Sequence, residues 1–331
     1  MKVTVALAVV LAISSSAHAQ SERELQIIAD GDRSGLKIEA NVAFTEGPAW
    51  HRPTNSVYFT DTTNHRIMRR DASGSLSVFR TPSGDANGLA FDQQLRLIAC
   101  EGGRDSRRVT RTELDGTITI LASDFNGKKY NSPNDVTVDS QGRIYFTDPR
   151  YGQQDGMEIF AADGSPIEGV YRIDPDGAVT QILASEVHRP NGIAISADEK
   201  FLFVADNDNR KQGNRKLWRF DLKADGSVDP VSQKELFDWR TELGVDRGPD
   251  GMCVGPHGNL YVTAGLNFDA QPTEVPKIYE AGVYVIDPSG KGLLNFIPIP
   301  QDVVTNCTFG GDDGKTLFVT AGHTLYSIHI Q

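Results

Sequence analysis

Short runs of alternating apolar and polar residues, separated by turns that contain glycine, fill most of this 331-residue chain. A period of two is typical of β-strands that bury one face. In the stretch that begins at Ser132, four such runs follow one another, at residues 134–139, 143–148, 169–174 and 178–183. The turns include Ser140-Gln141-Gly142 and Pro175-Asp176-Gly177, which favour antiparallel hairpins. Four short antiparallel strands are the size of one blade of a β-propeller.

The same unit recurs along the chain, and each copy begins with a polar residue just before its first strand. Successive copies begin between 41 residues (Glu46 to Asn87) and 59 residues (Asn191 to Asp250) apart. Units of this length in a fixed order predict radial blades rather than a single sandwich. The six copies begin at Glu46, Asn87, Asn134, Asn191, Asp250 and Asn306. The sequence therefore predicts an all-β fold, a six-bladed β-propeller that forms one domain over residues 20–331.

The last unit is too short to form a complete blade. After residues 316–321 it has only residues 324–330 with strand character, so a fourth strand is missing. An incomplete blade would leave an open sheet edge, which natural β-proteins avoid. Residues 36–39 have strand character and precede the first unit. We therefore expect an N-terminal strand to complete the last blade and close the ring.

Longer polar segments separate the predicted second and third strands of some units, at residues 149–168, 207–216 and 266–280. Long loops over one rim of such a fold commonly carry specificity. Helical periodicity is weak throughout, and residues 232–241 are the best candidate for a helix.

Residues 1–19 have the pattern of a secretory signal peptide. Lys2 precedes an apolar run over residues 3–13, and Ala17-His18-Ala19 matches an A-x-A cleavage site. A buried N-terminal helix is the alternative interpretation. No other run approaches the roughly 18 apolar residues that a membrane span requires. We therefore expect an exported protein, periplasmic or extracellular, that does not enter a membrane.

The chain is acidic, with a formal net charge of −11, which becomes −12 when Lys2 leaves with the signal peptide. This charge argues against partners such as nucleic acid or an anionic membrane surface. It is compatible with a small neutral substrate, and it leaves the oligomeric state open.

The polar residues that precede the six predicted first strands carry the most informative chemistry. The first strand of a propeller blade lies innermost, so equivalent side chains at its start converge on the axis. All six are carboxylates or carboxamides, and oxygen-only ligands favour calcium, then magnesium or manganese, with zinc as a further possibility. Glu46 and Asp250 would balance the charge of a divalent cation. The alternative is that pairs such as Asn87-Gly88 and Asn191-Gly192 are hairpin turns.

The three cysteines, Cys100, Cys253 and Cys307, have no zinc-binding spacing. They allow one disulfide and one thiol, and Cys253 with Cys307 is the favoured pair because both lie near the starts of neighbouring first strands. Three buried thiols are the alternative.

The chain resembles the gluconolactonase-like, senescence-marker-protein family of six-bladed propellers. The resemblance covers essentially all of the chain after residue 19. The matching stretches are Glu46-Gly47-Pro48-Ala49-Trp50, Ala99-Cys100-Glu101, Arg107-Arg108-Val109-Thr110-Arg111, Ser132-Pro133-Asn134-Asp135, Tyr145-Phe146-Thr147-Asp148-Pro149, Arg189-Pro190-Asn191-Gly192, Pro249-Asp250-Gly251-Met252 and Thr305-Asn306-Cys307-Thr308-Phe309-Gly310-Gly311.

The resemblance implies a divalent cation held by Glu46, Asn191 and Asp250, with Asn134 as a fourth ligand or a substrate contact. It also implies that Asp250 is the general base and that the substrates are sugar lactones. In such a reaction the cation would polarise the lactone carbonyl while the base activates water. Two positions depart from the pattern: Ser132 stands where some relatives have arginine, and Gly102 where bacterial relatives often have histidine.

Asn87, Glu101 and Tyr151 are further candidates for contacts with the substrate. Other functions are compatible with the same features. The site could hydrolyse another class of lactone, a phosphotriester or a fluorophosphate. The fold could also be a non-catalytic propeller that binds a partner at its rim.

Overall fold

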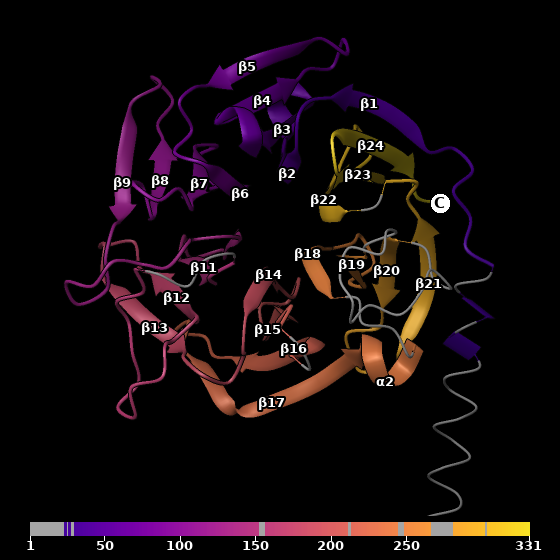
Figure 1. Ribbon diagram of the computed structural model, residues 1–331. Helices are drawn as coiled ribbons and strands as arrows, with labels where there is room; N and C mark the ends of the chain where they lie inside the picture. The colour runs from indigo at the N-terminus through magenta and orange to yellow at the C-terminus, as the bar shows by residue number, and fades with distance from the viewer. Residues whose placement is uncertain are drawn as a thin grey trace, which may run out of the picture.

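A computed structural model describes residues 23–24, 26–27, 30–151, 156–210, 213–243, 248–265, 281–301 and 303–331. Within these residues, six four-stranded antiparallel sheets stand radially around a central axis (Figure 1), which confirms the predicted six-bladed β-propeller. From the innermost strand outward, blade 1 consists of β2 (Thr45–His51), β3 (Ser56–Asp61), β4 (Arg66–Arg70) and β5 (Leu76–Arg80). Blade 2 consists of β6 (Ala86–Phe91), β7 (Leu97–Glu101), β8 (Arg108–Thr112) and β9 (Ile118–Ala122). Blade 3 consists of β10 (Val136–Val138), β11 (Ile144–Asp148), β12 (Gly169–Ile173) and β13 (Val179–Leu183). Blade 4 consists of β14 (Pro190–Ile195), β15 (Phe201–Asn207), β16 (Arg215–Leu222) and β17 (Val228–Asp238). Blade 5 consists of β18 (Pro249–Val254), β19 (Leu260–Ala264), β20 (Gly282–Ile286) and β21 (Leu293–Pro298). Blade 6 consists of β22 (Val304–Gly310), β23 (Thr316–Ala321), β24 (Thr324–His329) and β1 (Lys37–Asn41).

The N-terminal strand β1 closes the ring, as the short last unit predicts. It pairs antiparallel with β24, and the register joins Lys37 to Ser327 and Asn41 to Thr324. Thr324 Oγ1 donates to Asn41 Oδ1 at 2.8 Å, which adds a side-chain contact to the ladder. The first and last parts of the chain therefore share one sheet, and blade 6 has its fourth strand.

The period-two alternation of the strands explains how neighbouring blades pack. On β7, Leu97 and Ala99 belong to an apolar cluster shared with blade 1, whereas Ile98 and Cys100 belong to one shared with blade 3. Successive side chains of a strand point to opposite faces, so each sheet supplies residues to two interfaces. Six clusters of this kind lie between neighbouring blades in the described part of the chain. The hydrophobic core is therefore divided around the ring.

The weak helix candidate at residues 232–241 is a β-strand for most of its length. β17 continues to Asp238, and only α2 (Trp239–Leu243) follows it. The predicted signal peptide and the loop at residues 266–280 lie outside the described residues. Among the residues that are described, no helix is long and apolar enough to cross a membrane.

The seam between blades 6 and 1 allows a direct test of ring closure. Ala40 on β1 is 8% exposed and packs in a cluster with Phe59, Phe318 and Leu325, whereas Ile38 on the same strand is 64% exposed. Ala40→Asp should lower the free energy of unfolding by about 2–4 kcal/mol, because it buries an unpaired carboxylate. Ile38→Asp is the matched control and should change it by less than about 1 kcal/mol.

Urea denaturation of the two variants beside the wild type measures both values. Equal stability of the Ala40→Asp and Ile38→Asp variants would show that β1 does not seal the ring.

Candidate functional site

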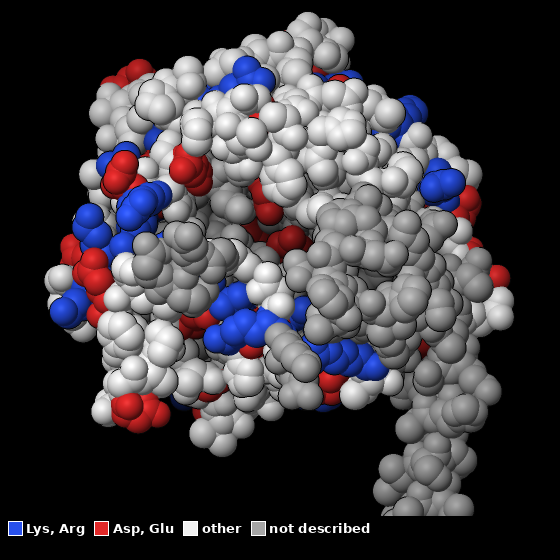
Figure 2. Space-filling model, in the orientation of Figure 1, with Lys and Arg blue, Asp and Glu red and all other residues white. Residues whose placement is uncertain are grey.

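The polar residues predicted to converge on the axis do lie on or beside the innermost strands. Glu46, Asn87, Asn191, Asp250 and Asn306 lie on β2, β6, β14, β18 and β22, and Asn134 lies two residues before β10. The space-filling view shows a hollow at the centre of the ring with acidic side chains at its floor (Figure 2). We call the six residues Glu46, Asn87, Asn134, Asn191, Asp250 and Asn306 the hub.

Glycines next to the hub residues allow the innermost strands to approach one another closely. A Cβ atom on Gly88 would lie 2.6 Å from the carbonyl oxygen of Asn134, and one on Gly192 would lie 2.3 Å from that of Asp250. Real Cβ atoms do not make such contacts, so only glycine fits at these positions. Gly88 and Gly192 lie within β6 and β14, so the alternative that Asn87-Gly88 and Asn191-Gly192 are hairpin turns is wrong. These glycines bring adjacent blades together at the hub.

A buried aspartate at the end of a second strand fixes the chain just before a hub residue. In blade 1, Asp61 Oδ1 accepts hydrogen bonds from the backbone N–H groups of Ala43 and Phe44, each at 3.2 Å. These two residues stand three and two positions before Glu46. The side chain of Asp61 is completely buried, and Arg66 pairs with its other oxygen at 2.8 Å. We call this arrangement the aspartate clamp.

The aspartate clamp recurs in blades 3 and 4 at the same spacing. Asp148 accepts from the N–H groups of Asn131 and Ser132, both at 2.8 Å, and Asp206 accepts from those of His188 and Arg189, at 3.1 and 3.0 Å. These residues again stand three and two positions before a hub residue, Asn134 or Asn191. Buried carboxylates that accept two N–H groups hold a backbone segment firmly. The clamps therefore position three of the six hub side chains, and sequence reasoning missed them although the recurring strand endings Thr60-Asp61 and Thr147-Asp148 were a visible signal.

Glu46 and Asp250 bring two carboxylates close together at the hub; Glu46 is buried, whereas Asp250 is partly exposed. Burial, followed by the nearby Asp250 carboxylate, raises the pKa of Glu46 well above its usual value. Burial, followed by the nearby Asp135 carboxylate, raises the pKa of Asp250 to about 8. Gly47 N–H donates to Glu46 Oε2 at 3.0 Å, which offsets only part of this cost. The hub therefore concentrates negative charge that a bound cation would stabilise.

Asp135 is a third acidic residue at the hub and was not predicted. It is 5% exposed, and burial raises its pKa to about 7. Its Oδ1 accepts from Val136 N–H at 2.9 Å, and the Asn306 side chain also hydrogen-bonds to its carboxylate. The adjacent pair Asn134-Asp135 was the available signal, but the assumption of one hub residue per blade left Asp135 out.

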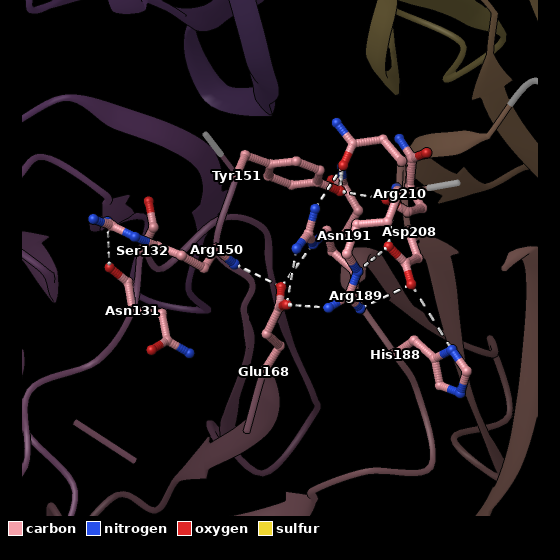
Figure 3. Close-up of polar contacts among 12 residues, drawn as sticks. Asn131, Ser132, Arg150, Tyr151, Glu168, His188, Arg189, Asn191, Asp208 and Arg210 are labelled. Atoms are coloured by element: carbon pink, nitrogen blue, oxygen red, sulfur yellow. Dashed lines mark hydrogen bonds and ion pairs between the residues drawn. The ribbon is translucent and has the colours of Figure 1, made fainter. Parts of the chain in front are cut away.

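The orientation of the Asn191 amide is fixed by its neighbours (Figure 3). Tyr151 Oη donates to the carbonyl oxygen of Asn207 at 3.2 Å, so it accepts from Asn191 Nδ2 at 2.9 Å. The Asn191 amide also donates to Asp250. Both N–H groups of the amide are then committed, and Oδ1 is the atom left to bind a cation.

A buried ion pair between Arg189 and Glu168 packs against Tyr151. Arg189 donates to Glu168 through Nε at 2.8 Å and through Nη2 at 3.0 Å, and both side chains are less than 5% exposed. The guanidinium carbon of Arg189 lies 5.2 Å from the centre of the Tyr151 ring. Glu168 also accepts from the backbone N–H of Arg150 at 2.8 Å, which ties down the residue before Tyr151. Paired charges of opposite sign therefore form the wall beside Asn191.

The donor set at the hub fits a hard divalent cation. Glu46 and Asp250 supply carboxylate oxygens, and Asn191 supplies an amide oxygen, all of which suit calcium, magnesium or manganese. In the described part of the chain, no group of three or more His, Cys, Asp or Glu side chains has metal-binding geometry. Any cation at the hub would therefore depend on asparagine oxygens as well as on carboxylates.

The three predicted substrate contacts, Asn87, Glu101 and Tyr151, occupy different environments. Tyr151 lies beside Asn191, and the Asn87 side chain hydrogen-bonds to Glu46. Glu101 is completely buried; its carboxylate pairs with Arg80 and accepts from Arg108 Nε at 2.7 Å and Thr110 Oγ1 at 2.6 Å. A substrate could reach Glu101 only if these contacts opened.

Asn134 is partly exposed, as Asp250 is, and two hydrogen bonds fix its backbone. Its N–H donates to the Thr147 carbonyl oxygen at 2.9 Å, and its own carbonyl oxygen accepts from Gly88 N–H at 2.7 Å. Its partial exposure is compatible with both predicted roles, a ligand of the cation or a contact with the substrate.

The two positions that depart from the family pattern touch each other. Ser132 Oγ donates to the Gly102 carbonyl oxygen at 3.1 Å. A Cβ on Gly102 would lie 2.5 Å from Ser132 Oγ, so a larger residue at position 102 requires the side chain at position 132 to move. The two residues that depart from the family pattern, Gly102 and Ser132, therefore lie in one place, and Ser132 is two positions before Asn134.

Comparison with known proteins gives the same family over most of the chain. The SMP-30/Gluconolactonase/LRE-like region matches residues 44–323. The gluconolactonase of Zymomonas mobilis is 28% identical over 317 residues, which cover 89% of this chain and 80% of the relative. The structure of a gluconolactonase from Xanthomonas campestris is 28% identical, has a TM-score of 0.70, and is matched over 89% of both chains. The calcium-binding protein regucalcin of Agrobacterium tumefaciens, 16% identical with a TM-score of 0.67 over 88% of this chain and 92% of its own, shares the fold. The chain therefore belongs to the SMP-30/gluconolactonase/LRE-like family.

Proposed function

We propose that this protein is a metal-dependent lactonase that opens sugar lactones at the hub. The observation that carries the proposal is the pair of neighbouring carboxylates, Glu46 and Asp250, whose pKa values are both raised, beside an asparagine whose amide oxygen is left to bind a cation. Gluconolactonases are among the relatives that match most of the chain, which favours a lactone as the substrate. Calcium is the proposed cation, because the donor atoms are all oxygens and a regucalcin of the same fold is described as calcium-binding.

Each residue has a separate role in this proposal. Glu46, Asn191 and Asp250 would hold the cation, and Asn134 would be a fourth ligand or a substrate contact. The bound cation would polarise the lactone carbonyl and stabilise the negative charge that develops on its oxygen. Asp250 would also accept the proton of the attacking water, because an ionised carboxylate at the site can act as a general base. We further propose that residues 1–19 direct export of the protein.

Asp250→Asn should keep the fold and lower the rate of gluconolactone hydrolysis by about 10²–10⁴-fold, because the amide cannot accept the proton. Asp176→Asn, in the exposed turn between β12 and β13, is the matched control and should leave the rate unchanged. A pH-stat assay with circular dichroism of each variant measures both properties. Hydrolysis at the wild-type rate by Asp250→Asn would refute the assignment of the base.

Removal of divalent metal with a chelator should abolish hydrolysis and lower the melting temperature. Added calcium at about 100 times its Kd should then stabilise the fold by about 2.7 kcal/mol, because it binds only the folded chain. Glu46→Gln should lose this calcium-dependent stabilisation, since it removes one ligand charge. Differential scanning calorimetry with and without calcium provides the measurement. Equal thermal shifts in Glu46→Gln and wild type would place the cation elsewhere.

Tyr151→Phe should weaken calcium binding about tenfold, because the Asn191 amide loses the acceptor that fixes its orientation. Isothermal titration calorimetry measures this affinity independently of activity. Tyr58→Phe is the control: the ring of Tyr58 packs against Phe79 in blade 1 and Phe91 in blade 2, away from Asn191 in blade 4. An unchanged calcium affinity in Tyr151→Phe would show that Tyr151 does not position Asn191.

A further inference from the structure

Two cysteines face each other across the boundary between blades 5 and 6. Cys253 on β18 and Cys307 on β22 are 54 positions apart in the chain, yet their sulfur atoms lie 3.4 Å apart. Both are free thiols. A disulfide has an S–S distance of about 2.05 Å, so a modest side-chain movement would join them.

The strands β18 and β22, which carry the two cysteines, pack against each other at the centre of the ring. A Cβ on Gly251 would lie 2.1 Å from Asn306 Cγ, and one on Gly255 would lie 3.2 Å from the Phe309 ring. These contacts fall just before and just after the two cysteines along β18 and β22. The two innermost strands therefore lie next to each other on both sides of the cysteine pair.

Reagents can reach the pair from the central channel. Cys253 and Cys307 line a cavity of about 410 Å³ whose walls come from the innermost strands of all six blades. Asp135 and Asn306 also line this cavity, whereas Glu46, Asn191 and Asp250 do not, so the cysteine pair faces a part of the channel next to the hub. Cys253 is partly exposed, whereas Cys307 is only 3% exposed. A small molecule in the channel would therefore meet Cys253 first.

We propose that Cys253 and Cys307 form a thiol–disulfide site that reversibly crosslinks blades 5 and 6. The thiolate of Cys253 attacks a small-molecule disulfide, forms a mixed disulfide and releases one small thiol. The thiolate of Cys307 then attacks the Cys253 sulfur, forms the Cys253–Cys307 bond and releases the second small thiol. The two protein thiols are oxidised, the small disulfide is reduced, and their two protons leave on the released thiols.

The crosslink would stabilise the part of the ring next to its closure. Blade 6 contains β1 and β24, and blade 5 is its neighbour, so the bond would join consecutive blades through their innermost strands. A crosslink that closes a loop of this length restricts the unfolded chain substantially. The melting temperature of the oxidised protein should therefore rise by about 5 °C.

The test uses the purified full chain, treated with hydroxyethyl disulfide as the oxidant. Denaturing alkylation and intact mass spectrometry should then find one free thiol in the wild type and none in Cys100→Ser, with the mass of each lower by two hydrogen atoms. Cys100 is buried in the cluster between blades 2 and 3, which makes it the matched control. Cys307→Ser should retain a mixed disulfide on Cys253, and peptide mapping of the wild type should join the peptides that contain Cys253 and Cys307.

Burial, followed by the contact with Cys307, raises the pKa of Cys253 well above its usual value, so crosslinking should be faster in alkaline buffer. The proposal would be overturned by three free thiols in treated wild type, by a stable adduct in place of the crosslink, or by a bond that involves Cys100. Peptide mapping and the melting temperature of the wild type decide the matter even if a serine variant fails to fold. None of these measurements depends on a bound cation or on lactone hydrolysis.

Discussion

The aspartate clamp is the interaction on which the geometry of the hub depends. Asp61, Asp148 and Asp206 each use a buried carboxylate to hold the two backbone N–H groups that stand just before Glu46, Asn134 or Asn191. Segments at the starts of innermost strands would otherwise have N–H groups without sheet partners, which is costly when they are buried. The clamps satisfy these groups and at the same time fix where the hub side chains begin.

The packed ring of blades, together with the clamp that precedes Glu46, holds charges that would otherwise move apart. Glu46, Asp250 and Asp135 all have raised pKa values because burial disfavours their ionised forms. In a flexible site such groups would turn towards solvent, but the blades pack through separate apolar clusters and the ring is closed by β1. The rigid ring therefore maintains a region of concentrated negative charge, and this is the physical basis for proposing a cation there.

The features that could be predicted from the sequence are those that repeat. Alternating strands and recurring turns gave the six blades, and the short last unit gave the closing role of β1. Contacts between residues far apart in the sequence could not be predicted in this way. Asp61 accepts a hydrogen bond from Ala43, 18 positions earlier, and Glu101 forms an ion pair with Arg80 on another strand. The Asn-Gly pairs were ambiguous because glycine serves hairpin turns and close strand approach equally well, and only the position of Gly88 and Gly192 within strands separates the two. Asp135 was missed because each blade was assumed to supply a single hub residue.

Anomalous X-ray diffraction from crystals grown with manganese tests the central claim most directly, since manganese accepts the same oxygen ligands as calcium and is visible in the anomalous map. Our account expects one strong peak on the propeller axis, within ligand distance of Glu46, Asn191 and Asp250 and with the Asn191 Oδ1 atom facing it. A hub without a peak at saturating manganese, with Glu46 and Asp250 turned away from each other, would contradict the account.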